Sequence, residues 1–219
     1  MAVDPLSFWQ RNSLTIVVTA LMLVFVICQA LAGHREYNHE LLEMGARQID
    51  LWPYLGSGHF VSAIFENWES EFLQMGMYVM LTASLRQKGS AESRPMSEVE
   101  EQPRIEPGPA PWPVRAGGVW KLLYGHSLAI ALYLLFLLSF MLHLAGSWRR
   151  EVHERLLKGE PPVAMSEFLF DSQFWFESFQ NWQSEFMAVA SVVVLSIWLR
   201  QKDSPQSKPL QAPHSQTGT

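Results

Sequence analysis

Residues 12–33 read NSLTIVVTALMLVFVICQALAG and carry no charged side chain. A second run, LLYGHSLAIALYLLFLLSFMLHLAGSW at residues 122–148, carries none apart from the titratable His126 and His143. About 20 helical residues cross the ~30 Å hydrocarbon core of a bilayer, and both runs reach that length. Neither run alternates polar and apolar faces as the core helix of a soluble protein does. The sequence therefore predicts a transmembrane helix in each run.

The first run also has the features of a cleaved signal peptide, because Arg11 precedes it and Ala30-Leu31-Ala32 imitates a cleavage site. An internal repeat argues for its retention. The equivalent element recurs at residues 127–146, where no signal peptide can lie. Cys28 is the only cysteine, so no disulfide can form within the chain.

The repeat appears when the sequence is shifted by 114 residues without gaps. Residues 13–95 then align with 127–209, and 27 of the 83 positions are identical. The densest block pairs FENWESEF at 65–72 with FQNWQSEF at 179–186. A second block pairs LRQK at 85–88 with LRQK at 199–202, and each is followed by Ser-x-x-Ser-[Arg/Lys]-Pro. The identities indicate a duplication.

The second apolar run of each copy is short, since it covers only residues 72–85 and 186–199. Fourteen residues rise about 21 Å, which is too little for a bilayer. We therefore expect each helix to begin upstream and to run through the Asn-Trp-x-Ser-Glu block, with Ser57 and Asp171 as helix caps. The first helix of each copy is expected to continue as a polar helix until Gly45 or Gly159.

The predicted fold is an all-α membrane protein with four transmembrane helices, built from two tandem helical hairpins related by a pseudo-twofold axis along the membrane normal. Residues 1–88 form the first hairpin, with spans at about 12–33 and 66–86, and residues 119–202 form the second, with spans at about 125–147 and 180–200. Residues 89–118 contain six prolines and few large apolar side chains, which predicts a flexible linker. Residues 203–219 are predicted to be a disordered tail.

The distribution of basic residues predicts the orientation. The N-terminus, linker and tail hold ten Lys and Arg against seven acidic residues, whereas the two hairpin loops with their helix extensions hold six against fourteen. Because basic residues stay on the cytoplasmic side, both termini and the linker are expected to be cytoplasmic.

Six polar residues are expected at similar membrane depth, and they form the predicted intramembrane polar cluster: Gln29, Asn67, Glu71, His143, Asn181 and Glu185. Ionisable groups inside a membrane usually face the bundle interior and often mark ion or proton pathways. The alternative is that Glu71 and Glu185 are solvated at the outer interface. The predicted interface anchors are two tryptophans and four basic residues: Trp68, Trp182, Arg86, Lys88, Arg200 and Lys202.

Several histidines and glutamates outside the membrane could coordinate a metal ion: His34, Glu36, His39, Glu40, Glu43, His59, His153 and Glu154. Their spacing fixes no ligand geometry, and solvated helix faces explain them, so no metal site is predicted. The chain has no phosphate-binding glycine loop, no nucleophile beside a base and no dinucleotide motif, so no cofactor is predicted.

The FENWESEF and FQNWQSEF blocks and the LRQK-x-Ser endings resemble those of a family of uncharacterised bacterial membrane proteins, known only as a domain of unknown function. The resemblance covers nearly the whole chain and implies a bacterial inner-membrane location without transferring any catalytic residue. The leading hypothesis is a non-enzymatic structural or partner-binding component whose partners are the lipid bilayer and a second copy or another membrane protein, not nucleic acid. The alternative is a small proton- or cation-conducting unit that uses Glu71 and Glu185.

Overall fold

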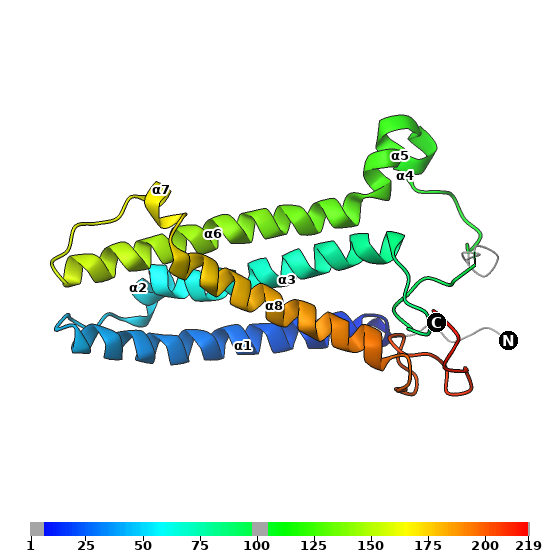
Figure 1. The fold of residues 1–219 in the computed structure, drawn as a ribbon, viewed down its shortest axis with the longest axis horizontal. Coiled ribbons are helices and arrows are strands. Elements are labelled where there is room, and N and C mark those ends of the chain that lie inside the picture. Colours follow the sequence, from blue (N-terminus) through cyan, green and yellow to red (C-terminus); the bar gives the residue numbers. More distant parts are fainter. Residues whose placement is uncertain (1–6, 98–104, 219) are drawn as a thin grey trace. The chain divides into compact units, whose positions relative to one another are not determined.

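The computed structural model describes residues 7–97 and 105–218, and every regular element within them is a helix. The four long helices are α1 (Phe8–Glu43), α3 (Gly58–Ser84), α6 (Ser127–Leu157) and α8 (Ser172–Leu195). The short ones are α2 (Leu51–Leu55), α4 (Trp112–Ala116), α5 (Gly118–Gly125) and α7 (Met165–Phe168) (Figure 1). The prediction of an all-helical fold is confirmed.

The helix boundaries follow local signals. Ser7 caps α1 in a capping box with Gln10, and the Asp171 side chain accepts a hydrogen bond from the Gln173 backbone at the start of α8. Ser57 accepts one from the Phe60 backbone as α3 begins. Both α3 and α8 continue without a break through their Asn-Trp-x-Ser-Glu blocks, as their short apolar runs predicted.

Two of the long helices, α1 and α6, are long and apolar enough to cross a membrane. The sequence predicts four transmembrane helices, and α1 and α6 are the two among the described residues that qualify as candidate spans. Helices α3 and α8 differ because carboxylates and amides occupy their first halves. Most apolar side chains of α1 are exposed, including Leu14 at 78% and Phe25 at 66%, so α1 presents an apolar surface.

The described chain divides into two compact units that do not coincide with the two sequence copies. The first unit combines Met1–Ile64 with Leu142–Leu169, and the second combines Phe65–Met141 with Phe170–Thr219. Helices α3 and α6 are continuous across the unit boundaries. Each unit therefore contains segments from both copies of the repeat.

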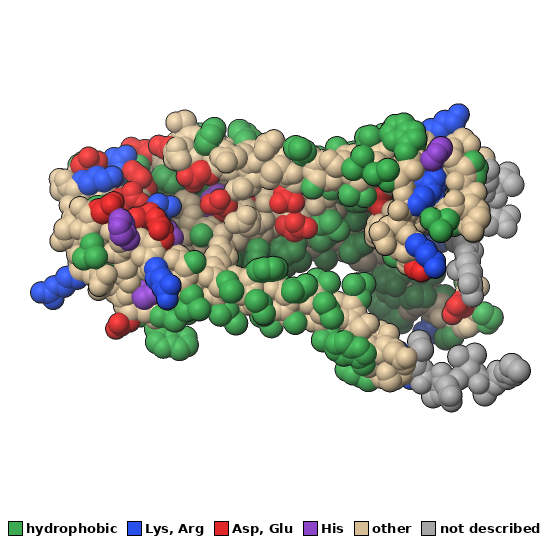
Figure 2. Space-filling model, turned by 90° about the horizontal axis from the view of Figure 1, so that it is seen from below, with side chains coloured by type: hydrophobic (Ala, Val, Ile, Leu, Met, Phe, Trp, Pro, Cys, Tyr) green, Lys and Arg blue, Asp and Glu red, His purple; other side chains and the backbone are tan. Residues whose placement is uncertain are grey.

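The core of the first unit is formed by Tyr37 and Leu41 of α1 and Tyr54 of α2, against which Phe60 and Leu157 pack. Charged side chains and histidines gather at the end of this unit where α1 and α6 terminate (Figure 2). Glycine allows α3 and α6 to approach closely, because a Cβ at Gly146 would lie 2.5 Å from the Ser62 nitrogen. The Ser62 and Ser147 hydroxyls meet at 2.7 Å in this contact.

The same hydrogen bonds recur in the first unit at positions 114 residues apart. The Ala46 nitrogen donates to Leu41 O at 2.8 Å after α1, and Glu160 donates to Arg155 O at 2.8 Å after α6. Gly45 and Gly159 precede these donors with φ values of 71° and 74°. A positive φ is accessible to glycine at little cost, which explains the two predicted helix stops.

The second unit contains a cluster of aromatic rings from α6 and α8. Phe140 packs edge-on against Phe174, which is fully buried, and Phe136 packs edge-on against Trp182. Gly76 of α3 brings that helix against Leu132 and Tyr133 of α6. Aromatic burial and close backbone approach thus hold α3, α6 and α8 together within this unit.

The repeated Ser-x-x-Ser endings also fold alike in the second unit. The Ser93 hydroxyl accepts from the Gln87 nitrogen at 2.9 Å, and the equivalent Ser207 hydroxyl accepts from Gln201 at 2.9 Å. Lys208 is buried and donates to the carbonyl oxygens of Gly89, His214 and Gln216. The described parts of the linker and tail, which composition predicts to be flexible, are therefore joined by hydrogen bonds.

Candidate functional site

Helix α3 carries a row of buried polar side chains within the second unit. Glu69, Ser70 and Gln74 are exposed by only 0%, 1% and 3%. Ser70 satisfies its hydroxyl locally by donating to the Asn67 carbonyl. The Gln74 side-chain nitrogen has no hydrogen-bond partner among the described residues. Because burial of a polar group is costly unless it is paired, this row marks a part of α3 with a specific role.

Helix α8 supplies the partners of two carboxylates in this region. The Asn181 amide donates to Glu66 Oε1 at 2.9 Å, and the Trp182 indole nitrogen donates to Glu69 Oε1 at 3.1 Å. The Trp182 ring also packs edge-on against Phe179 and Trp175. These rings lower the access of water to the Glu69 contact, which strengthens the hydrogen bond.

Glu71 of α3 and Glu185 of α8 lie close to this contact in sequence, and their carboxyl groups are near enough to interact electrostatically. Glu71 is exposed and Glu185 is partly buried. The pair therefore places two acidic groups side by side between two helices.

The six residues of the predicted polar cluster are divided between the two units. Gln29 and His143 belong to the first unit, where the Gln29 amide donates to the Ala63 carbonyl at 3.1 Å and His143 is fully buried. The four others belong to the second unit, which brings Glu71 and Glu185 together. The hydrogen bond of the Asn181 amide goes to Glu66, which lies opposite it on α3.

The predicted interface anchors have several different contacts. Trp182 packs among aromatic rings of its own unit, whereas Trp68 is 37% exposed and contacts Phe65. Arg200 donates to the carbonyls of Ser196 and Ala212, so it caps the end of α8 and holds the tail. The remaining basic anchors have exposed side chains: Arg86, Lys88 and Lys202.

Glu66, Glu69 and Gln74 were missed as site residues. The second copy has Gln180 and Gln183 where the first has Glu66 and Glu69, which implied that the repeat does not need charge there. Helical spacing contained the signal, because residues 66, 69, 70 and 74 follow an i, i+3, i+4, i+8 pattern and share one face. Polar residues on a single face of an otherwise apolar helix indicate a polar helix contact.

The histidines considered for metal coordination have protein contacts in the first unit. His34 Nε2 lies 2.8 Å from Ile49 O, and His59 Nδ1 lies 3.2 Å from the Tyr54 hydroxyl. His39 and Glu43 form an exposed pair at 3.5 Å. Burial and then the Arg150 charge lower the pKa of His59 to about 4, so His59 is neutral at pH 7.

One known family matches nearly the whole chain. The family model described as "Domain of unknown function (DUF6766)" matches residues 6–219. The chain belongs to this family. The DUF6766 match therefore spans residues 13–95 and 127–209, which align with each other in sequence, together with the linker and the tail. The chain matches no curated protein and no solved structure.

Proposed function

We propose that this DUF6766 protein is a non-enzymatic, multi-pass component of the bacterial inner membrane with a structural or partner-binding role. The observation that carries the proposal is that carboxylates of α3 are hydrogen-bonded to side chains of α8. Glu66 and Glu69 accept hydrogen bonds from Asn181 and Trp182 of α8. Carboxylates engaged in this way join the two hairpins instead of acting on a substrate.

In this proposal α3 and α8 cross the membrane together with α1 and α6. Their 27 and 24 residues correspond to about 40 and 36 Å of helix, which exceeds the ~30 Å hydrocarbon core. Two hydrogen bonds join their polar halves, and their apolar halves expose side chains such as Met80 and Val192. Polar side chains inside a membrane normally face a neighbouring helix in this way.

Both termini and the linker lie in the cytoplasm in this proposal. The basic residues already favour this orientation. Helices α4 and α5, directly before α6, add Trp112 and Trp120 in mutual contact together with Arg115 and Lys121, all exposed. Aromatic and basic side chains of this kind prefer the membrane–water interface, so this segment is expected to lie on the cytoplasmic leaflet.

Reporter fusions test this orientation. Fusions at Ile105 and at the C-terminus should have the activity expected of a cytoplasmic reporter, whereas a fusion at Gly45 should have that of an external one. An external reporter at Ile105 together with an internal one at Gly45 would mean that the topology is inverted. Equal behaviour at all three positions would contradict the membrane proposal itself.

A second function is favoured by one observation, the proximity of the Glu71 and Glu185 carboxyl groups. Ionisable groups that neighbour each other inside a membrane are a typical element of proton pathways. The buried Gln74 amide lies three residues further along α3 and could bind a water molecule beside such a path. The alternative is therefore a small proton- or cation-conducting unit, which would require oligomerisation because four helices enclose little pore.

Ion flux across liposomes separates the two functions. For the structural role, we expect liposomes with the purified protein to show no more proton or cation flux than empty ones. For the conducting role, the wild type gives a flux that the double substitution Glu71→Gln and Glu185→Gln abolishes. Flux that survives the double substitution would contradict both, because it would arise elsewhere in the chain.

A further inference from the structure

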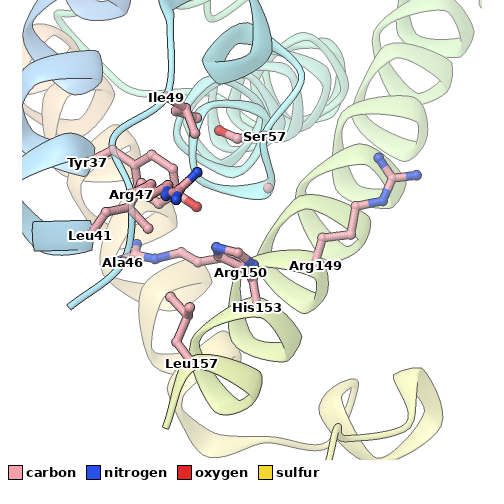
Figure 3. Close-up of a pocket in the computed structure, with 11 residues that line it drawn as sticks. Tyr37, Leu41, Ala46, Arg47, Ile49, Ser57, Arg149, Arg150, His153 and Leu157 are labelled. Atoms are coloured by element: carbon pink, nitrogen blue, oxygen red, sulfur yellow. The ribbon is translucent and has the colours of Figure 1, made fainter. Parts of the chain in front are cut away.

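A pocket of about 500 Å³ lies in the first unit, between the ends of α1 and α6 and the start of α3. Tyr37 and Leu41 of α1 and Leu157 of α6 form apolar parts of its wall, and Ile49 and Ala46 add to them from the loop after α1. Figure 3 shows Arg47 and Arg150 directed toward the same space, while the guanidinium of Arg149 points away from it. The pocket thus combines an apolar wall with cationic groups.

The charged residues that line the pocket are all basic. Its lining contains three arginines and His153 but no Asp or Glu. Arg150 is balanced by Glu154 at 2.9 Å and by Glu40 at 3.6 Å. Arg47, by contrast, has no ion pair among the described residues. An exposed guanidinium without a carboxylate beside an apolar wall is suited to an anionic ligand, because its planar fork binds phosphate through two hydrogen bonds.

The start of α3 adds to this positive potential. Ser57 and Gly58 line the pocket, and Gly58 is the first residue of a 27-residue helix. The amino end of a long helix carries a partial positive charge, which favours a nearby anion. No acidic residue occupies the first turn of α3. Two independent features, the unpaired Arg47 and the helix end, therefore point to the same ligand charge.

The loop that carries Arg47 is held in place from both sides. Asn38 is buried, and its amide group donates to Ile49 O at 2.9 Å and accepts from Ile49 N at 2.8 Å. Tyr54 packs against Tyr37 beneath the same region with ring centres 5.8 Å apart. Fixing the loop before the ligand arrives lowers the entropic cost of binding.

The position of the pocket along α1 indicates the source of the anion. Its α1 residues, Tyr37 and Leu41, follow the last residue of the uncharged run, Gly33, by four and eight positions. These steps correspond to about 6 and 12 Å along the helix, which is the depth of the lipid headgroup layer beyond the hydrocarbon core. A lipid headgroup would bring both a phosphate for Arg47 and apolar carbon for Leu41 and Leu157.

We propose that this pocket binds the phosphate of an anionic phospholipid headgroup, with Arg47 as the main phosphate ligand and Arg150 as a second cation held in place by Glu40 and Glu154. This proposal rests on the membrane location proposed above. The same chemistry would accept a free phosphate group, so inorganic phosphate is the second probe.

The test measures binding of phosphatidylglycerol and of inorganic phosphate to the full-length protein in neutral detergent, with phosphatidylcholine as the zwitterionic comparison. Phosphatidylglycerol should bind the wild type best, and Arg47→Gln should weaken its binding about tenfold or more. Arg35→Gln is the matched control, because Arg35 is an exposed arginine of α1 that does not line the pocket. This control should bind like the wild type.

Three results overturn the proposal or its lipid part. Equal phosphatidylglycerol affinity of the Arg47→Gln and Arg35→Gln proteins would mean that the pocket is not the site. Equal binding of phosphatidylcholine and phosphatidylglycerol would exclude recognition of the net anionic charge. Binding of inorganic phosphate alone, dependent on Arg47, would replace the lipid by a soluble phosphate.

Alkaline extraction of cell membranes distinguishes failure of the lipid-binding proposal from failure of the proposed membrane location. If the wild type is released from membranes, the proposed membrane function fails whatever the pocket binds. If the wild type and the Arg47→Gln protein both stay in the membrane while their lipid affinities are equal, only the pocket proposal fails.

Discussion

Replacing Glu69 by leucine is expected to lower the stability of the protein by about 2–3 kcal/mol. The Glu69 side chain is fully buried and accepts the Trp182 indole hydrogen bond at 3.1 Å. Leucine fills a similar space but leaves the indole N–H of a partly buried ring without its acceptor. Glu69→Gln keeps a carbonyl oxygen for this donor, so it should cost at most about 1 kcal/mol. Thermal unfolding in detergent, followed by circular dichroism, measures both.

The repeat provides a matched control for Glu69. Gln183 occupies the equivalent position of the second copy, and its side chain is exposed. Gln183→Leu should therefore leave the unfolding temperature nearly unchanged. A double-mutant cycle with Trp182→Phe isolates the pair, because Glu69→Leu should cost less once the indole donor is absent. If Glu69→Leu and Gln183→Leu unfold at the same temperature, the α3–α8 contacts do not stabilise the protein and the structural role loses its support.

Helix existence and many helix ends could be predicted from sequence because local signals decide them. Gly45 and Gly159 stop two helices through a positive φ, and Asp171 starts another through its carboxylate. Continuity of α3 and α8 through the Asn-Trp-x-Ser-Glu blocks followed from bilayer thickness and helical rise. Such features depend on a few neighbouring residues, so a single sequence contains them.

The partners of the polar side chains could not be predicted in the same way. The rotation of α3 about its own axis decides whether Glu69 or Glu71 is buried, and this rotation depends on packing against α8. Comparing the two copies was misleading at Glu66 and Glu69, because only the first copy uses these positions as acceptors for Asn181 and Trp182. A duplicated sequence does not require symmetric use of each repeat position.

The close contact between α3 and α6 in the first unit was also missed, although small residues at Gly58, Ser62, Gly146 and Ser147 indicate it. Small residues allow helix backbones to approach, and this is a common mode of packing between membrane helices. A Cβ at Gly58 would lie 2.6 Å from Gly146 O, and a Cβ at Gly146 would lie 2.5 Å from Ser62 N. Both clashes involve backbone atoms, which cannot rotate away as a side chain can.

Gly146→Ala is therefore expected to destabilise the protein by about 2 kcal/mol or more, because the added methyl group forces α3 and α6 apart. Separation of the helices would also break the 2.7 Å hydrogen bond between Ser62 and Ser147. Ser147→Ala removes that bond without introducing a clash and should lower the stability by about 1 kcal/mol. It therefore tests the contact between α3 and α6 even if Gly146→Ala fails to fold. Thermal unfolding in detergent compares the variants.

Gly125→Ala is the control for the intrinsic effect of the substitution, since a Cβ at Gly125 meets no atom within 4 Å. Alanine there should be neutral or slightly stabilising, because it reduces the conformational freedom of the unfolded chain. The close packing of α3 on α6 predicts a clear order of unfolding temperatures: Gly125→Ala at or above the wild type, then Ser147→Ala, then Gly146→Ala. If the Gly146→Ala protein unfolds at the same temperature as the Gly125→Ala protein, the backbones of α3 and α6 do not touch at Gly146. The start of α3 must then be held in the first unit by Tyr54 and Phe60 instead.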